Sequence, residues 1–550
     1  MDANTQNISE ATIALIDSLK STTSHFGLAN SGGEYKIITE MFLYKYFNDK
    51  FGYEAKRDKV YGERLSKADK WDAEYDKFTE EEVEDLFSYL PASVPLLKPE
   101  HTLAHLYNTS GGGDFSTRLD ATLIDIANLN ADTFSVVTSG KSRVNIFSAL
   151  TQFVTDPQKR DDFARSLMSS VASFNFESVF AEKYDFFSRI FEYLIKDYNN
   201  AGGGKYAEYY TPRAIAQVMA RLLVGDNADL CYDPSAGTGT LLMALAHQIG
   251  EDRCTIFSQD ISEKSSEMLR LNLILNNLSG SLPNVVQGNT LTEPYHKEEN
   301  GALRKFDFVV SNPPFNLDFS DFRDTLAADA VRFWAGVPSV PAKKKESMSI
   351  YLCFIQHLIN SLKTTGKGAI VIPTGFITAK SGVERKVLTK IIDNRWVYGC
   401  ISMPSNVFAN TGTNVSVLFF DKAAFAEKVI LIDASKLGEE YKEGKNKKRR
   451  LLKDDIDLIV NTFKNKEAVE DFSVAVSYDE IIEKNYSLSA GQYFDIKIDY
   501  VDITEEEFNS RMAEYKKTLS EQFAESHRLE EEIMKQLDAL RFNANIGDNE

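Results

Sequence analysis

Four consecutive residues, Asn312-Pro313-Pro314-Phe315, have side chains that could act together on a planar amino group. Each proline fixes its φ angle and lacks an N–H, so the stretch predicts a rigid loop whose carbonyl groups remain available as acceptors. The amide oxygen of Asn312 and an adjacent backbone carbonyl could accept both N–H bonds of an exocyclic NH2 group. That pairing would pull the nitrogen out of conjugation with its ring and expose its lone pair, while Phe315 could stack on the ring. The loop therefore predicts that an amino nitrogen is made nucleophilic.

This loop follows the hydrophobic run 306–310, which predicts a buried strand. A strand that ends in a proline-stiffened turn needs no chemistry, so for the loop by itself a purely structural explanation stays open. The segments that precede the loop favour the explanation that the loop has a chemical role.

A glycine-rich turn, Asp233-Pro234-Ser235-Ala236-Gly237-Thr238-Gly239, lies between a predicted strand over 228–232 and a predicted helix over 241–246. This order is typical of the first unit of a doubly wound α/β domain, where glycines let the backbone approach a ligand. A second predicted strand, over 254–260, ends in Asp260, about 20 residues past the turn, where a carboxylate can bind ribose hydroxyls. A dinucleotide site would favour a third glycine at the position of Leu242, so the NAD interpretation weakens.

Upstream of the turn lies Glu208-Tyr209-Tyr210-Thr211-Pro212-Arg213. Thr211 before Pro212 predicts an N-cap with proline at the first helical position, opening a helix over 214–223. A well-capped helix would explain this segment by itself. The fixed order of segment, glycine turn, acid and Asn-Pro-Pro-Phe loop favours one binding site built from all four.

In this order the motifs resemble those of amino-methyltransferases, especially DNA N6-adenine methyltransferases. The resemblance implies a Rossmann-like class I α/β sheet and S-adenosyl-L-methionine as cofactor. It also implies that the 208–213 segment closes over the methionine end and that Asn289 contacts the cofactor's adenine. The target adenine would be flipped out of the duplex onto Phe315. The predicted catalytic residues are Asn312, Pro313, Pro314 and Phe315, and the predicted cofactor-binding residues are Glu208, Tyr209, Tyr210, Thr211, Pro212, Arg213, Asp233, Ser235, Ala236, Gly237, Thr238, Gly239, Asp260, Ile261 and Asn289.

Length and composition indicate a chain of several domains. At 550 residues it is too long for one core, and 43% apolar residues are enough to bury two or three. Its apolar runs are short of a membrane span and its first residues form no signal peptide, so a cytoplasmic protein is expected. The four cysteines are scattered without paired spacing, so neither a disulfide framework nor a metal site is expected.

The net charge argues against unaided DNA binding. The chain has 62 Lys and Arg against 81 Asp and Glu, a formal charge of −19, whereas a protein that binds DNA alone is expected to present a basic face. Two local basic runs, 343–345 and 445–450, could contact phosphates or could simply be solvated loops. A partner is therefore expected to hold the DNA.

We expect an all-helical N-terminal domain over 1–195, a methyltransferase domain over 196–430, and a C-terminal region over 431–550. Helical periodicity marks the first domain, as at 37–47 and 186–195. At the other end Thr504 and Glu507 form a predicted capping box that opens a long amphipathic helix. Its apolar stripe could pack on its own chain or bind a partner helix. The stripe contains Phe508, Met512, Tyr515, Leu519, Phe523, Leu529, Ile533, Leu537 and Leu540.

From about residue 30 to about residue 540 the chain resembles the modification subunit of type I restriction-modification systems. An opening helix over 33–47 and a late loop over 403–414 extend the likeness beyond the motifs above. The resemblance implies a DNA-specificity subunit as partner, two copies of this chain for each, double-stranded DNA as substrate, and in some systems a restriction and translocation subunit. The chain has no Walker A motif, so ATP hydrolysis would belong to that other subunit. Residues 346–351 lack the acid that members often have there, and residues 49–94 receive no assignment.

Two other functions stay open. Asn-Pro-Pro-aromatic loops also occur in enzymes that methylate protein glutamine or RNA guanine, although Phe315 and the large flanking regions favour DNA adenine. The chain could also be a noncatalytic assembly scaffold, against which the intact Asn312, Asp233 and Asp260 argue.

Overall fold

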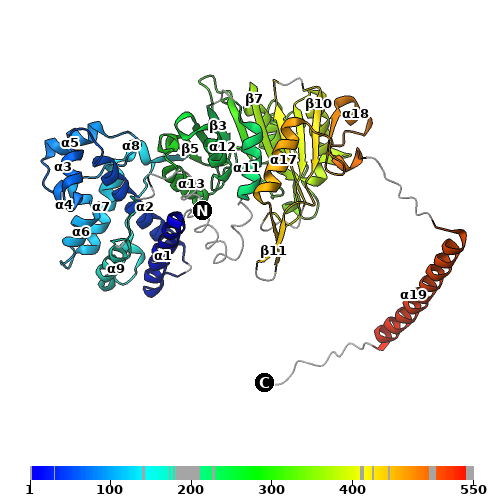
Figure 1. Ribbon diagram of the computed structural model, residues 1–550, viewed down its shortest axis with the longest axis horizontal. Helices are drawn as coiled ribbons and strands as arrows, with labels where there is room; N and C mark the ends of the chain where they lie inside the picture. Colours follow the sequence, from blue (N-terminus) through cyan, green and yellow to red (C-terminus); the bar gives the residue numbers. More distant parts are fainter. Residues whose placement is uncertain are drawn as a thin grey trace. The chain divides into compact units, whose positions relative to one another are not determined.

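The computed structural model describes residues 3–29, 31–138, 143–172, 174–177, 180, 211–225, 229–408, 414–423, 426–443, 446–494 and 503–539 (Figure 1). The chain divides into two compact units, Met1–Phe494 and Asp495–Glu550. Within the described residues, no helix combines the length and the apolar composition that crossing a membrane requires.

A large mixed sheet forms the centre of the first unit. In the described residues it has eleven strands in the order β13-β10-β8-β9-β7-β6-β3-β4-β5-β1-β2. The strands β7, β6, β3, β4 and β5 run parallel, while β9 is antiparallel to both β7 and β8. The strand bounds are β1 (Val136–Thr138), β2 (Arg143–Val144), β3 (Leu230–Asp233), β4 (Thr255–Asp260), β5 (Val285–Gln287), β6 (Phe306–Ser311), β7 (Leu362–Pro373), β8 (Val397–Ser402), β9 (Val415–Asp421), β10 (Lys428–Asp433) and β13 (Ser473–Ser477).

Helices cover both faces of this sheet because its strands bury both faces. Successive residues of β3 and β6 point to opposite sides, so Cys231 and Val310 belong to one hydrophobic core and Tyr232 and Val309 to the other. The first core contains α11 (Arg213–Leu223), α12 (Thr240–Ile249), α13 (Glu263–Leu275) and α17 (Lys453–Asn465), and the second contains α14 (Arg323–Ala328), α15 (Tyr351–Ser361), α16 (Gly382–Asp393) and α18 (Tyr478–Glu483).

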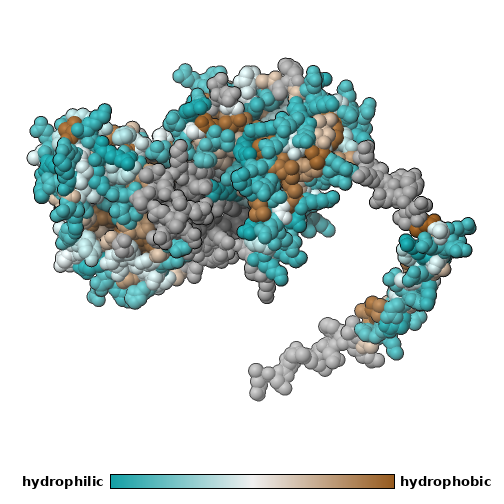
Figure 2. Space-filling view, viewed as in Figure 1, coloured by the Kyte–Doolittle hydropathy of each residue, from teal (hydrophilic) through white to brown (hydrophobic). Residues whose placement is uncertain are grey.

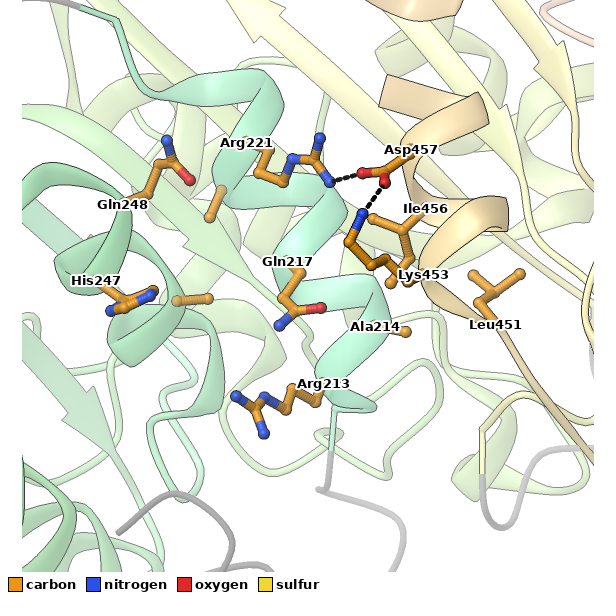
Figure 3. A pocket seen from close by; sticks show the side chains of 12 residues that line it. Arg213, Ala214, Gln217, Arg221, His247, Gln248, Leu451, Lys453, Ile456 and Asp457 are labelled. Carbon is orange, nitrogen blue, oxygen red and sulfur yellow. Dashed lines mark hydrogen bonds and ion pairs between the residues drawn. The ribbon is translucent and has the colours of Figure 1, made fainter. Parts of the chain in front are cut away.

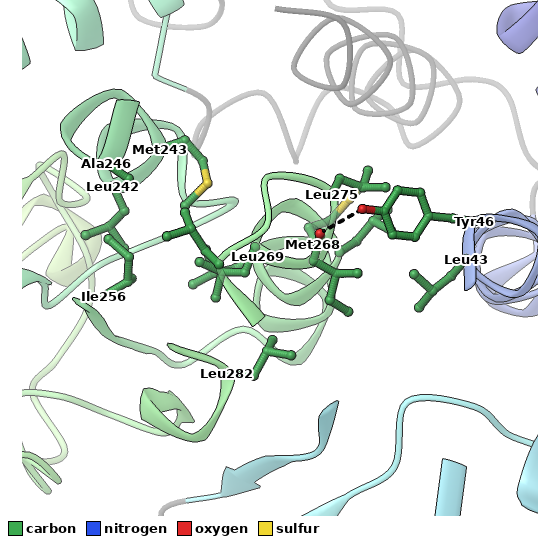
Figure 4. Packing of buried hydrophobic residues seen from close by; sticks show 14 of the residues in the cluster. Leu43, Tyr46, Leu242, Met243, Ala246, Ile256, Met268, Leu269, Leu275 and Leu282 are labelled. Atoms are coloured by element: carbon green, nitrogen blue, oxygen red, sulfur yellow. Dashed lines mark hydrogen bonds between the residues drawn. The ribbon is translucent and has the colours of Figure 1, made fainter. Parts of the chain in front are cut away.

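The N-terminal region is helical, as predicted, and its core is continuous with the first core of the sheet. Leu43 and Tyr46 of α2 lie beside α13, where the Tyr46 hydroxyl donates to the carbonyl of Ile274 at 3.3 Å (Figure 4). The previously unassigned residues 49–94 form the end of α2 and three further helices. The bounds are α1 (Ala3–His25), α2 (Gly32–Ala55), α3 (Gly62–Lys67), α4 (Trp71–Tyr75), α5 (Glu80–Tyr89), α6 (Leu103–Asn108), α7 (Phe115–Leu129), α8 (Ala131–Phe134) and α9 (Arg160–Ala172).

The region also contributes two short strands that the sequence did not indicate. β1 pairs in parallel with β5 and antiparallel with β2, extending one edge of the sheet. The predicted helical stretch 186–195 and the predicted boundary at 195/196 lie outside the described residues. The predicted boundary at 430/431 falls within β10, and the first compact unit continues to Phe494.

The second unit is built around α19 (Glu505–Ala539). Its predicted capping box is confirmed, because the backbone N–H of Glu507 donates to Thr504 Oγ1 at 3.2 Å and the Glu507 carboxylate accepts from the Thr504 N–H at 3.4 Å. Every residue of α19 is exposed, and apolar side chains interrupt its hydrophilic surface (Figure 2). Leu540, the last predicted member of the stripe, lies outside the described residues.

Candidate active site

The topology brings the predicted motifs to one edge of the sheet. The chain proceeds from β3 to β4 and β5 on one side of β3, then returns to place β6 on the other side. Such a reversal leaves a crevice at the carboxyl ends of the strands, where ligands of open α/β sheets bind. Asp233 ends β3, Asp260 ends β4, and Asn312 directly follows β6. Three of the four predicted segments therefore meet at this crevice.

The amide of Asn312 is held by a hydroxyl from the fourth segment. Asn312 Nδ2 donates to Thr211 Oγ1 at 3.0 Å, and Thr211 is buried. The prediction that Thr211 caps the following helix is wrong. Helix α11 begins at Arg213 with Pro212 as its N-cap residue and no side-chain cap. The Thr211 hydroxyl instead accepts from an amide on a strand-end loop distant in sequence, a tertiary contact that local spacing could not reveal.

The other residues of the Asn-Pro-Pro-Phe loop are buried or half-buried. Pro313 is buried, and Pro314 and Phe315 are half-buried. The Phe315 ring meets Tyr351 of α15 edge-on, with ring centroids 6.4 Å apart, and Tyr351 meets Phe376 in the same way at 6.0 Å. Aromatic packing of this kind fixes the orientation of the Phe315 ring.

The glycine turn has a backbone that side chains would disrupt. Gly237 and Gly239 have φ angles of +52° and +84°, in the left-handed region that favours glycine. A Cβ on Gly239 would lie 2.1 Å from Leu269 Cδ1, the movable end of a side chain on α13, so the positive φ is the stronger reason for glycine here. The turn thus keeps the N-terminus of α12 near the end of β3, as nucleotide-binding sheets require.

Asp260 stabilises the glycine turn through hydrogen bonds. Its carboxylate accepts hydrogen bonds from the backbone N–H groups of Gly237 and Ser262, both at 2.8 Å. Burial raises the pKa of Asp260, and these two hydrogen bonds oppose the rise. The side chain of Ile261, the next residue, is 68% exposed, so an apolar surface is presented beside the acid.

Asp233 is a buried acid that prefers to be protonated. Burial raises its pKa to about 8, hydrogen bonds from Ser235 lower it, and the negative charge of Asp260 raises it. The Ser235 backbone N–H donates to the Asp233 carboxylate at 2.9 Å. A buried acid beside a second carboxylate favours the approach of a cation, which would stabilise the ionised form of Asp233.

A pair of hydroxyls joins the glycine turn to the catalytic loop. Ser235 Oγ and Ser311 Oγ share a hydrogen bond of 2.6 Å, and Thr290 Oγ1 donates to the Pro234 carbonyl at 2.7 Å. Ser235 was among the predicted residues, whereas Ser311 and Thr290 were missed. Isolated hydroxyls carry no sequence pattern, and only the adjacency of Ser311 to Asn312 could have drawn attention to it.

The other residues predicted to bind the cofactor either contact neighbouring parts of the chain or lie outside the described residues. The Asn289 side-chain oxygen accepts from the N–H groups of Leu291 and Thr292 at 3.0 and 3.4 Å, which stabilises the turn after β5. Ala236 is buried, and the carbonyl of Thr238 accepts from Asn272 Nδ2 at 3.2 Å. Glu208, Tyr209 and Tyr210 lie outside the described residues.

Arg213 lines a groove of about 600 Å³ between α11, α12 and α17 (Figure 3). Arg213, Gln217 and Arg221 follow one another along α11, and Arg221 and Lys453 each pair with Asp457 at 2.6 Å. Sequence reasoning assigned Arg213 to the cofactor and did not foresee this groove.

The basic runs differ in their surroundings. Residues 343–345 are exposed. Residues 446–450 of the second run form β12 (Asn446–Arg450), which makes a two-stranded ribbon with β11 (Glu439–Glu443). There Arg450 pairs with Glu439 at 2.7 Å and Lys447 with Glu440 at 3.0 Å, so acidic residues neutralise part of the run.

The Rossmann-like sheet carries the glycine turn, the acid Asp260 and the Asn-Pro-Pro-Phe loop at one edge. This arrangement is that of methyltransferases with the class I α/β fold. The model of the N-6 DNA Methylase family matches residues 182–500. The chain belongs to this family, which confirms the resemblance and the predicted fold class.

Relatives and solved structures agree with this assignment. The chain is 30% identical over 348 residues to the type I restriction enzyme MpnII methylase subunit of Mycoplasma pneumoniae, covering 61% of each chain. It is 27% identical over 374 residues to the MjaIX methylase subunit of Methanocaldococcus jannaschii, covering 65% of this chain and 64% of that protein. The chain thus spans less than two thirds of either relative.

The crystal structure of a type I restriction-modification methyltransferase subunit from Streptococcus thermophilus has the same fold. It superposes with a TM-score of 0.67 at 23% identity and covers 89% of this chain and 100% of that one.

Proposed function

We propose that this chain is the methyl-transferring subunit of a type I restriction-modification system and methylates adenine N6 in double-stranded DNA. The observation that carries the proposal is the Asn312 amide directly after β6, which donates at 3.0 Å to Thr211 in the segment before α11. The relatives, which are named as type I methylase subunits, support the same assignment.

The site fits S-adenosylmethionine as the cofactor. The glycine turn brings backbone close to the end of β3, where a Cβ on Gly239 would collide with Leu269. In this proposal Asp260 holds ribose hydroxyls, the exposed Ile261 covers an adenine ring, and buried Asp233 meets a positive charge; their burial and charge support these roles. When bound, this cofactor supplies an activated methyl group on a positively charged sulfur.

The loop residues act on the amino group of the target. The Asn312 side-chain oxygen and the Pro313 carbonyl accept the two N6 hydrogens, so the lone pair of N6 turns away from the ring and towards the methyl group. Phe315, held by Tyr351, stacks on the flipped base and offsets part of the cost of unstacking, which is about a few kcal/mol. Because positioning and lone-pair exposure suffice, the residues need not form a covalent intermediate.

A DNA-specificity subunit completes the enzyme. The net charge of −19 disfavours strong unaided contact with phosphates. The exposed apolar stripe of α19 offers a surface for a partner helix. We propose two copies of this chain for each specificity subunit, association with a restriction subunit where the system has one, and action in the cytoplasm.

The identity of the methylated nucleoside tests the proposal. DNA is purified from methylase-deficient cells that express this chain with the specificity subunit of its own system, and its nucleosides are analysed by mass spectrometry. N6-methyladenine is expected, and it should be absent with Asn312→Ala. A methylated cytosine in place of N6-methyladenine, or DNA without any added methyl group, would contradict it.

A further inference from the structure

The contact between Thr211 and Asn312 directly joins a residue predicted to bind the cofactor to a residue predicted to be catalytic. Thr211 is 5% exposed and its Oγ1 accepts from Asn312 Nδ2 at 3.0 Å. The hydroxyl is not used by helix α11, which has no side-chain cap. The N–H groups of Ile215 and Ala216 donate instead to the Pro212 carbonyl at 3.0 and 3.1 Å. The Thr211 hydroxyl is therefore committed to the amide of Asn312.

We propose that Thr211 is a positioning residue that sets which end of the Asn312 amide faces the substrate; this rests on the proposed function. An asparagine amide has an acceptor end and a donor end of nearly equal size. Only the oxygen can accept a hydrogen from an amino group, whereas the NH2 end would oppose it with hydrogens of its own. By taking the nitrogen end, Thr211 directs the oxygen end towards the amino group that reacts.

A second hydroxyl contact restrains the backbone that carries Asn312. Ser311 Oγ shares a hydrogen bond of 2.6 Å with Ser235 Oγ, and the Ser235 N–H donates to Asp233 at 2.9 Å. The side chain of Asn312 is thus tied to the segment before α11, and the residue before it is tied to the glycine turn. Both ties run to segments predicted to bind the cofactor, so the segments that hold the methyl donor also orient the methyl acceptor.

Thr211→Val tests the role because valine keeps the shape of threonine and lacks the hydroxyl. Thr211→Ser keeps the hydroxyl and should restore function. Thr39→Val is the matched control, because Thr39 is also buried and donates to the carbonyl of Tyr35 at 2.8 Å within α2, away from the sheet edge. Each variant is made in the full chain and assayed with the specificity subunit for kcat, KM for DNA, Kd for S-adenosylmethionine and Tm.

The expected result is a loss confined to turnover. Thr211→Val should lower kcat by about 10- to 100-fold, the size expected when a reacting group is misplaced, and should change KM and Kd by less than about threefold. Thr211→Ser should recover most of kcat, and Thr39→Val should leave kcat unchanged even if it lowers Tm. In an Asn312→Ser background, which lacks the amide nitrogen, adding Thr211→Val should have no further effect on single-turnover rates.

Three results would overturn the inference. These are an unchanged kcat in Thr211→Val, a loss of cofactor affinity that accounts for the whole effect, or a full Thr211→Val penalty in the Asn312→Ser background. Failure of the proposed function is seen separately, as a wild-type complex that binds cofactor and transfers no methyl group to adenine N6.

Discussion

The catalytic edge of the sheet and helix α19 use polar and apolar groups in opposite ways. At the edge, buried and half-buried polar side chains satisfy one another, as Asn312 does with Thr211 and Ser235 with Ser311. On α19, large apolar side chains lie on the surface: Phe508 is 51% exposed and Phe523 is 65% exposed. Buried polar groups that find partners within the chain define a site ready for chemistry. Exposed apolar groups in a stripe mark a surface made for another molecule.

The comparison indicates a division of labour. The proposed function assigns methyl transfer to this chain and assigns delivery of the DNA to a partner. Helix α11 shows the contrast at the level of one element, because it too is amphipathic and yet buries its apolar side against α12, α17 and the sheet. Helix α19 also carries an apolar stripe, and its residues are exposed throughout.

The largest expected effect comes from removing the amide at the catalytic edge. Asn312→Ala should lower kcat by about 1000-fold, because one of two acceptors for the reacting amino group is lost at a preorganised site. Cofactor affinity and assembly with the specificity subunit should stay unchanged. Single-turnover methyl transfer and calorimetry measure these quantities. If Asn312→Ala also weakened assembly with the specificity subunit, the edge of the sheet and helix α19 would not act independently.

The next effect concerns the stripe of α19. Replacing Tyr515, Leu519 and Phe523 by serine should weaken binding of the specificity subunit by about 100-fold or more, since each buried side chain contributes about 1.5–3 kcal/mol. The control replaces Lys517 and Glu521, which pair at 3.9 Å away from the stripe, by serine. Affinity is measured by calorimetry with full-length chains. Equal effects of the two sets would mean that the stripe is not the contact surface.

A smaller effect should appear in the pH dependence of cofactor binding. The pKa of Asp233 is raised to about 8, so at pH 7 the group is mostly protonated without ligand, and a bound cation would favour its ionised form. Affinity for S-adenosylmethionine should therefore rise with pH, by at most about tenfold per unit, up to about pH 8 and level off above it.

Binding at pH 7 should release a proton, detected by calorimetry in buffers of different ionisation enthalpy. Asp233→Asn should abolish that release. Because the pKa of Asp233 is raised in the folded chain, ionisation of Asp233 destabilises the folded state. Without ligand, the free energy of unfolding should therefore fall as pH rises from about 4 towards 8, and Asp233→Asn should remove this contribution to the fall. Proton release that persists in Asp233→Asn would assign it to another group.

The smallest effect is expected at the link between turn and loop. Ser235→Ala removes the 2.6 Å hydrogen bond to Ser311 and the longer one, 3.3 Å, that Ser235 Oγ donates to the Asp233 carboxylate, and it leaves the backbone N–H of residue 235 on Asp233. We expect kcat to fall by about threefold to tenfold, because a single neutral hydroxyl is lost. A loss as large as that of Asn312→Ala would mean that Ser235 itself contacts the reacting groups.

Much of the fold follows from local pattern. Strands β3, β4 and β6 and helices α11 and α12 lie within a few residues of their predicted bounds, because their apolar runs and flanking turns are strong. The order of motifs also predicted that Asp233, Asp260 and Asn312 share an edge, since carboxyl ends of parallel strands meet there.

The sequence-based prediction that was wrong, and the features that the sequence did not indicate, all depend on contacts between segments distant in the sequence. Thr211 was expected to cap α11 because Thr-Pro spacing favours it locally, and a long-range partner overrode that preference. β1 and β2 are too short to carry a pattern and exist through pairing with β5. The Ser235 to Ser311 contact and the groove at Arg213 likewise depend on segments that only the folded chain brings together.

The most direct test of the central claim is methyl transfer from tritiated S-adenosylmethionine to unmodified DNA, with and without the specificity subunit. The account predicts label in N6-methyladenine only when the specificity subunit is present, and none with Asn312→Ala. Efficient labelling of adenine by this chain alone would contradict the division of labour. Label in protein or RNA, or none in the complete complex, would contradict the assignment of the reaction itself.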